Sequence, residues 1–108
     1  IDPAAVETCR LNSTLNHVEA NIEHVCGILD DLPESTFDLV LANIYGDILL
    51  NVAKDLSQKA APDARMLLSG ILYEYNFGVR RRYERCNCQV TKNFMLNEFS
   101  TVLLKKNR

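Results

Sequence analysis

The chain has 108 residues, the size of one small domain, and 47% of them are hydrophobic, which is enough to supply a core. A formal net charge of −2 provides no broad basic field of the kind that drives non-specific nucleic-acid binding. No apolar run approaches the roughly 20 residues that a membrane span needs, and no segment resembles a signal peptide. The composition therefore predicts a soluble, cytoplasmic protein without direct contacts to nucleic acid or membrane.

The cysteine pattern favours reduced thiols over disulfides, because the sequence has no secretory signature. Cys86 and Cys88 are separated by one residue rather than two, and His17 and His24 lie seven residues apart. Neither spacing is typical of zinc ligands, so we predict no metal site. The four cysteines are Cys9, Cys26, Cys86 and Cys88.

The first third of the chain predicts one helix and one short strand. Asp2-Pro3 is a favoured pairing of a capping residue and a first helical turn, and it predicts a helix over Pro3–Asn16. Apolar residues beside polar ones, closed by a glycine, predict a short strand over Ile22–Gly27.

The middle of the chain alternates strand and helix. Phe37–Ile44 is a continuous apolar run, which predicts a parallel, central strand covered on both faces. After Gly46, apolar residues recur every three or four positions from Ile48 to Ala60, which predicts one amphipathic helix that Pro62-Asp63 ends.

The last third predicts a strand, a helix and a hairpin. Met66–Ser69 is a short apolar strand broken by Gly70, and a helix is expected over Tyr73–Arg85. Two strand-like runs, Cys88–Met95 and Phe99–Leu104, flank a turn-prone segment. We expect an α/β fold with a mostly parallel sheet that ends in an antiparallel hairpin.

Ligands of such sheets bind beyond the carboxyl ends of the strands, where Asn43 and Ser69-Gly70 fall. Two segments at these ends carry a family resemblance. Asp38-Leu39-Val40-Leu41-Ala42-Asn43-Ile44 and Leu67-Leu68-Ser69-Gly70-Ile71-Leu72, with the start Ile1-Asp2-Pro3, resemble the corresponding segments of PrmA-type methyltransferases.

The resemblance covers nearly the whole chain, and it implies a Rossmann-like class I methyltransferase fold. It also implies S-adenosylmethionine as cofactor and transfer of methyl groups to amino groups of a large-subunit ribosomal protein. The family's glycine-rich loop has no counterpart here, because no G-x-G-x-G can be built from the four glycines. We therefore expect the C-terminal part of one catalytic domain, with the N-terminal strands missing and no activity on its own.

The resemblance implies that Asn43 is the catalytic residue, which orients the substrate amine and also borders the cofactor. An asparagine offers one acceptor and two donors, and such positioning is the main task in methyl transfer. The alternative is an asparagine that caps the following helix. Ile44, Ser69 and Gly70 would shape the substrate side of the pocket, or Ser69-Gly70 would form a plain turn.

The remaining cofactor residues implied by the resemblance lie in the first third of the chain. Ile1 and Asp2 would lie beside adenine and ribose, although Asp2 is equally well explained as a helix cap. Gly27 and Ile28 would border the adenine, or form a simple turn. Ile28 departs from the family, in which many members have an aspartate at this position.

Some roles stay open at the level of sequence. Tyr45 and Asp47 are suggested as a general base only by their closeness to Asn43, and a first-turn helix role is favoured for both. Arg80-Arg81-Arg82 is more typical of a solvated helix face than of an RNA site. Alternative functions are a methyltransferase of another protein lysine or of a small amine, and a catalytically inert binding module. The oligomeric state is not readable from the sequence.

Overall fold

The chain divides into two compact units, Ile1–Glu34 and Ser35–Arg108, in a computed structural model that describes residues 1–33 and 35–108. The first unit contains the helix α1 (Pro3–Leu15) and the short 3₁₀ helices η1 (Glu19–Asn21) and η2 (Leu29–Asp31). Asp2 caps α1, since its side chain accepts a hydrogen bond of 3.0 Å from the amide of Ala4. The predicted first helix is confirmed to within one residue.

The predicted strand over Ile22–Gly27 is wrong, because this segment has no strand structure. A strand requires a partner for its backbone groups, and none of the described strands pairs with it. The segment is instead held by a side-chain contact of 3.0 Å between Ser13 Oγ and His24 Nε2. Ser13 is the only buried residue among those described in the first unit.

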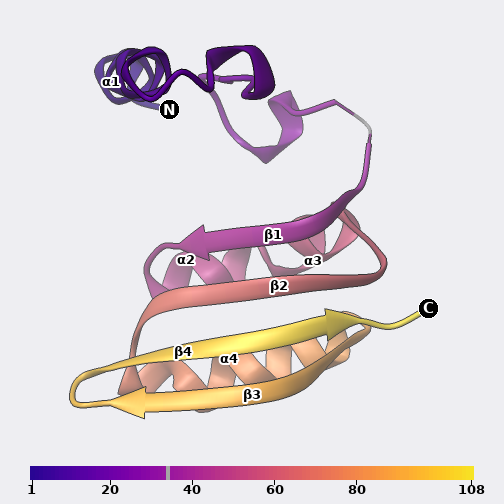
Figure 1. The fold of residues 1–108 in the computed structure, drawn as a ribbon. Helices are drawn as coiled ribbons and strands as arrows, with labels where there is room; N and C mark the ends of the chain where they lie inside the picture. Colours follow the sequence, from indigo (N-terminus) through magenta and orange to yellow (C-terminus); the bar gives the residue numbers. More distant parts are fainter. Residues whose placement is uncertain (34) are drawn as a thin grey trace. The chain divides into compact units, whose positions relative to one another are not determined.

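The second unit is built on a four-stranded sheet in the order β1-β2-β4-β3, as Figure 1 shows. Its strands are β1 (Phe37–Asn43), β2 (Ala60–Leu72), β3 (Cys88–Leu96) and β4 (Phe99–Lys106). β1 and β2 are parallel, whereas β4 is antiparallel to both β2 and β3. The predicted parallel pairing and the C-terminal hairpin are confirmed.

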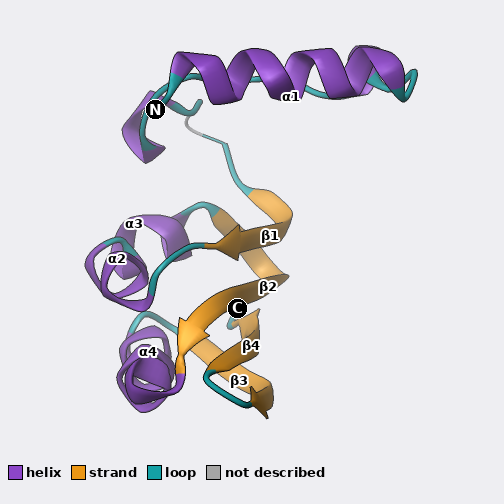
Figure 2. Ribbon diagram, turned by 90° about the vertical axis from the view of Figure 1, so that its left-hand side faces the viewer, coloured by secondary structure: helices purple, strands orange, loops and turns teal. Residues whose placement is uncertain are grey.

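Three helices cover one face of this sheet, as seen edge-on in Figure 2. They are α2 (Gly46–Asn51), α3 (Ala53–Gln58) and α4 (Tyr73–Arg85). The helix predicted over residues 73–85 is confirmed. The single helix expected over residues 48–60 is wrong, because it breaks at Val52 and ends before residue 60.

The core lies between the helices and the sheet. Tyr83 of α4 is fully buried, and its hydroxyl donates a hydrogen bond of 2.9 Å to the carbonyl of Leu49, three residues before the break at Val52. Burial raises the pKa of the Tyr83 hydroxyl well above its usual range, so it remains a donor. The buried apolar residues are Leu49, Ala53, Leu56, Ala60, Ala64, Met66, Leu68, Ile71, Val79, Tyr83, Cys88, Val102 and Leu104.

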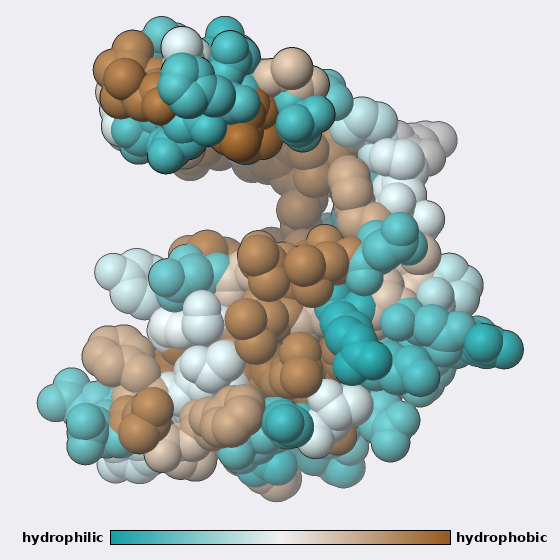
Figure 3. Space-filling model, viewed as in Figure 1, coloured by the Kyte–Doolittle hydropathy of each residue, from teal (hydrophilic) through white to brown (hydrophobic). Residues whose placement is uncertain are grey.

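The opposite face of the sheet is apolar but open. β1 lies at the edge of the sheet, and Leu39 and Leu41 on it are 58% and 66% exposed. The register aligns Leu41 with Leu67 of β2 and Leu67 with Leu103 of β4. Figure 3 shows hydrophobic side chains gathered on this face. The expectation of a central strand covered on both faces is therefore wrong for the described residues.

β2 is longer than the predicted Met66–Ser69. Pro62-Asp63 lies inside the strand instead of ending a helix, and the register with β1 shifts between Phe37 and Leu39. A left-handed backbone at Asp63, with a φ of 67°, accommodates this irregularity.

No helix in the described part of the chain is long and apolar enough to span a membrane.

Candidate active site

Asn43 and Gly70 meet at the carboxyl ends of the two parallel strands. Asn43 ends β1, and its Cα pairs with that of Ser69 on β2. Adjacent parallel strands have their carboxyl ends at the same end of a sheet, so the side chain of Asn43 comes next to the backbone that follows Ser69. A Cβ added to Gly70 would collide with Asn43 Oδ1. The structure brings Asn43 and Gly70 together near the carboxyl ends of the strands, where the sequence placed them.

The backbone at Gly70 makes this close approach possible. Gly70 has a φ of 76°, a left-handed conformation that glycine adopts at little cost. The register between β2 and β4 shifts between Leu68 and Ile71, so Gly70 lies in an irregular part of β2. β2 nevertheless continues to Leu72, and the prediction that Gly70 ends the strand is wrong.

A cavity opens at this end of the sheet. Its volume of about 480 Å³ is typical of small-ligand sites. Most of its wall is apolar or aromatic, and the Asn43 amide is the one polar side-chain group on it apart from the Tyr45 hydroxyl. The residues around it are Asn43, Ile44, Tyr45, Ile48, Gly70 and Phe99. An apolar wall with a few polar groups favours a ligand that is partly desolvated and oriented by hydrogen bonds.

Asn43 does not cap the following helix. The capping residue of α2 is Tyr45, and no side-chain hydrogen bond caps that helix end. Within the described part of the chain, the Asn43 amide makes no hydrogen bond, so its donors and acceptor are available to a ligand. The capping alternative raised by the sequence is therefore wrong.

The other sequence-predicted residues divide between the cavity and its surroundings. Ile44, like Gly70, lines the cavity, whereas Ser69 pairs with Asn43 on the sheet but is absent from the lining. Of the two suggested bases, Tyr45 borders the cavity and Asp47 does not. Sequence reasoning missed Ile48, because its helical spacing indicated a buried core residue. In the structure, Ile48 is 42% exposed and lines the cavity.

Phe99 reaches the cavity from the opposite end of the sequence. It begins β4, directly after the β3–β4 turn, and Figure 1 shows this turn at the same end of the sheet as the end of β1. The amide of Tyr73 donates a hydrogen bond of 2.8 Å to the carbonyl of Glu98, which fastens the turn to the start of α4. The sheet order places Phe99 at the same end of the sheet as Asn43.

A buried polar network holds the hairpin beside Gly70. Ser100 Oγ donates a hydrogen bond of 3.2 Å to the carbonyl of Ile71, the residue after Gly70. Asn76 Nδ2 donates hydrogen bonds of 2.8 Å to both Ser100 Oγ and Asn93 Oδ1. A buried network with all of its partners present rigidifies the surrounding structure.

The four proposed cofactor residues of the first unit also come together there. The carbonyl of Ile1 lies 3.5 Å from the Sγ of Cys26, which brings the start of the chain beside the segment Gly27-Ile28. Ile1 is 84% exposed and Ile28 is 58% exposed. Both are thus exposed apolar side chains on neighbouring segments.

Gly27 and Asp2 both have structural roles as well. A Cβ added to Gly27 would collide with the Asp31 side chain, which accepts a hydrogen bond of 2.8 Å from the amide of Ile28. The carboxylate of Asp2 caps α1 through one oxygen, Oδ1. The turn and the helix cap that the sequence raised as alternatives are therefore both present.

Metal ligands do not cluster in the described residues, where no group of three or more His, Cys, Asp and Glu side chains comes together. Cys88 is buried with its Sγ 3.7 Å from Ser57 Oγ, and burial raises the pKa of its thiol. Cys9 and Cys26 are exposed, and all four cysteines are free thiols.

Residues 1–107 match the family described as ribosomal protein L11 methyltransferase (PrmA). The chain belongs to this family. Among curated relatives, the L11 methyltransferase of Ralstonia pickettii is 47% identical over 72 residues, and that of Ralstonia nicotianae is 44% identical over 72 residues. These matches cover 67% of this chain but 23% of each relative, so the matched part of the chain spans about a quarter of their length.

Solved structures share the fold across the whole chain. The ribosomal protein L11 methylase of Lactobacillus delbrueckii subsp. bulgaricus matches 100% of this chain and 55% of its own, with a TM-score of 0.88 and 20% identity. An RNA methyltransferase of Salinibacter ruber, solved with S-adenosyl-L-homocysteine, matches 100% of this chain and 63% of its own, with a TM-score of 0.76 and 15% identity. The Rossmann-like α/β fold expected from the sequence is thus confirmed for this PrmA-family chain.

Proposed function

We propose that this PrmA-family chain is the C-terminal part of the catalytic domain of an S-adenosylmethionine-dependent methyltransferase. The proposed substrates are amino groups of the large-subunit ribosomal protein L11. The observation that carries the proposal is Asn43, which stands at the carboxyl end of β1 with a free amide beside Gly70. Membership of the PrmA family supports the choice of a ribosomal protein as partner.

The proposed chemistry is a displacement at a methyl carbon. Transfer would form an N–C bond at the amine and break the S–C bond of the sulfonium, whose bonding electrons would leave with the neutral thioether. S-adenosylmethionine, when bound, supplies this activated methyl group. The nitrogen loses its extra proton to solvent afterwards. The tasks left to the protein are to orient the amine and to exclude water.

Asn43 is proposed to orient the amine. Its Oδ1 accepts a hydrogen bond from an amine N–H, which turns the nitrogen lone pair away from the asparagine and toward the methyl group. Ile44, Ile48 and Phe99 form the apolar part of the same cavity. An apolar surrounding disfavours the charged ammonium, so these residues favour the neutral, nucleophilic amine.

The residues proposed to hold the cofactor are Ile1, Asp2, Gly27 and Ile28. Ile1 and Ile28 supply exposed apolar surface for adenine, while the backbone at Gly27-Ile28 allows close approach. Asp2 Oδ2 is not needed for the helix cap and suits a ribose hydroxyl. Asn43 is proposed to border the cofactor as well as the substrate.

The proposal is tested with the complete gene product that contains this chain, incubated with methyl-labelled S-adenosylmethionine and purified L11. We expect label in L11, located by mass spectrometry on lysine or α-amino groups. L11 whose amines have been blocked by acetylation is the control and should take up none. Equal labelling of blocked L11 would contradict transfer to amines, and labelling of another protein or a small amine alone would contradict L11 as substrate. The absence of any transfer would favour an inert binding module.

A further inference from the structure

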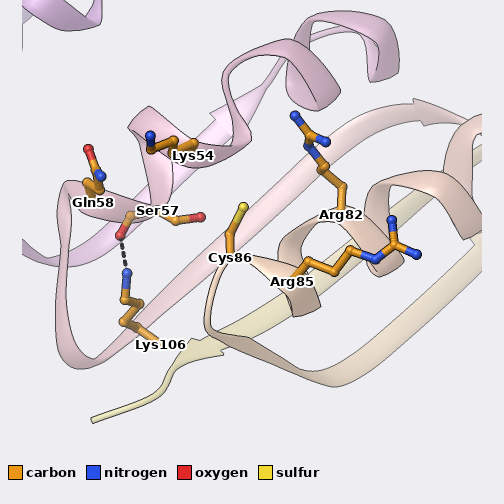
Figure 4. A pocket seen from close by; sticks show the side chains of 7 residues that line it. All are labelled: Lys54, Ser57, Gln58, Arg82, Arg85, Cys86 and Lys106. Carbon is orange, nitrogen blue, oxygen red and sulfur yellow. Dashed lines mark hydrogen bonds between the residues drawn. The ribbon is translucent and has the colours of Figure 1, made fainter.

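A second cavity lies at the opposite end of the sheet from Asn43. Its volume is about 480 Å³, and it borders the last residue of β4, whereas the first residue of β4, Phe99, borders the Asn43 cavity. Figure 4 shows side chains of α3 on one side of it, those of α4 on the other, and Cys86 between them. The residues that line it are Lys54, Ser57, Gln58, Arg82, Arg85, Cys86 and Lys106.

The cations of this cavity lack carboxylate partners. In the part of the chain that the structure describes, Lys54, Arg82 and Arg85 form no ion pair, and Lys106 donates a hydrogen bond of 2.7 Å to the carbonyl of Ser57. The neighbouring cations behave differently, because Arg81 pairs with Glu84, and Lys105 and Arg108 both pair with Asp63. Four positive charges therefore border one cavity whose described lining contains no acidic side chain.

The helix dipole accounts for only part of this arrangement. Arg82 and Arg85 lie in the last turn of α4, where a cation is favoured by the negative end of the helix. Lys54 lies in the first turn of α3, where the dipole disfavours a cation, and Lys106 comes from a strand. Cations from three separate elements therefore line one cavity, and local stability explains only those of α4.

The geometry points to a binding site for phosphate groups, carried either by a small phosphoanion or by an RNA backbone. Arginine presents a planar fork of donors that matches phosphate oxygens, and lysine adds a compact charge. A phosphate group carries more negative charge than a single carboxylate, so it can use several of these cations at once. The site is separate from the proposed methyl-transfer cavity and does not depend on its assignment.

The test uses the complete gene product and two variants, each of which replaces two cationic side chains by glutamine and so removes the same charge. The pocket variant is Lys54→Gln with Arg82→Gln. The control is Arg65→Gln with Lys92→Gln, which removes two exposed cations that lie outside the cavity and form no ion pair among the described residues. Pyrophosphate binding is measured by titration calorimetry, and binding of a short single-stranded RNA by fluorescence anisotropy over a salt series.

We expect the pocket variant to lose about tenfold or more in pyrophosphate affinity and the control to keep it, because only the former loses charge-assisted hydrogen bonds. If the phosphate comes from RNA, the pocket variant also binds RNA about tenfold more weakly, and its salt slope falls by about 1.4 for two lost contacts. If it comes from a small anion, RNA binding is equal in both variants. Equal loss of pyrophosphate affinity in both variants, or no pyrophosphate binding by the unmodified protein, would overturn the proposal.

Discussion

The two units of the chain hold their proposed site residues by different means. In Ile1–Glu34 the only buried residue among those described is Ser13, and the candidate cofactor residues are fixed by a helix cap and a tight turn. All of the buried apolar residues among those described belong to Ser35–Arg108, and the Asn43 cavity lies at one end of the sheet in this unit. Substitutions should therefore act locally in the first unit and cooperatively in the second.

The largest effect on stability is expected for Gly70→Ala. The new Cβ collides with Asn43 Oδ1 and forces an L-residue into a left-handed conformation at φ 76°. These two costs together should lower the free energy of unfolding by about 2–4 kcal/mol, as measured by urea denaturation. The matched control is Gly78→Ala in α4, where the nearest atom is 4.0 Å from the added Cβ. Equal destabilisation by both would contradict the tight packing at Gly70.

A smaller loss is expected for Tyr83→Phe. The substitution removes the hydroxyl that donates to the carbonyl of Leu49 near the break between α2 and α3. A buried acceptor without its partner should cost about 1–3 kcal/mol of unfolding free energy. Tyr73→Phe, at a residue that is 63% exposed, is the comparison and should change stability by less than about 0.5 kcal/mol. A neutral Tyr83→Phe would mean that another donor satisfies Leu49.

The smallest effect is expected for Asp2→Ala in the first unit. Loss of the cap at the start of α1 should cost about 1 kcal/mol, whereas Asp2→Asn keeps a capping acceptor. Amide hydrogen exchange should accelerate in α1 and remain unchanged in β2 and β4. Accelerated exchange in the sheet as well would show that the two units unfold together, which would remove the distinction between them.

The sequence predicted those elements whose signals are local. The helix over Tyr73–Arg85 and the cap at Asp2 follow from short-range patterns, and the structure has both. The expected strand over Ile22–Gly27 failed because pairing depends on distant segments. The continuous apolar run of β1 correctly indicated a parallel strand, but it gave no information on which described elements cover each face.

Part of the candidate site was placed by signals of the same local kind. Asn43 was placed at a strand end by the order of strands and helices along the chain, and β1 does end there. Gly70 was also placed at a strand end, but β2 continues past it, and parallel pairing brings the two residues together. Phe99 was not assigned to the site from the sequence, because the antiparallel return of β4 beside β2 sets its position. The basic cavity was also missed, since its cations come from three elements that are far apart in the sequence.

The central claim is that Asn43 orients the substrate amine, and Asn43→Ala in the complete gene product tests it most directly. We expect kcat for L11 methylation to fall by about tenfold to a thousandfold through loss of this positioning contact, while the Kd for S-adenosylmethionine changes by less than about threefold. Asn51→Ala, at an exposed position on α2 outside the cavity, is the control and should leave both constants unchanged. Unchanged kcat together with weakened cofactor binding in Asn43→Ala would contradict the assignment.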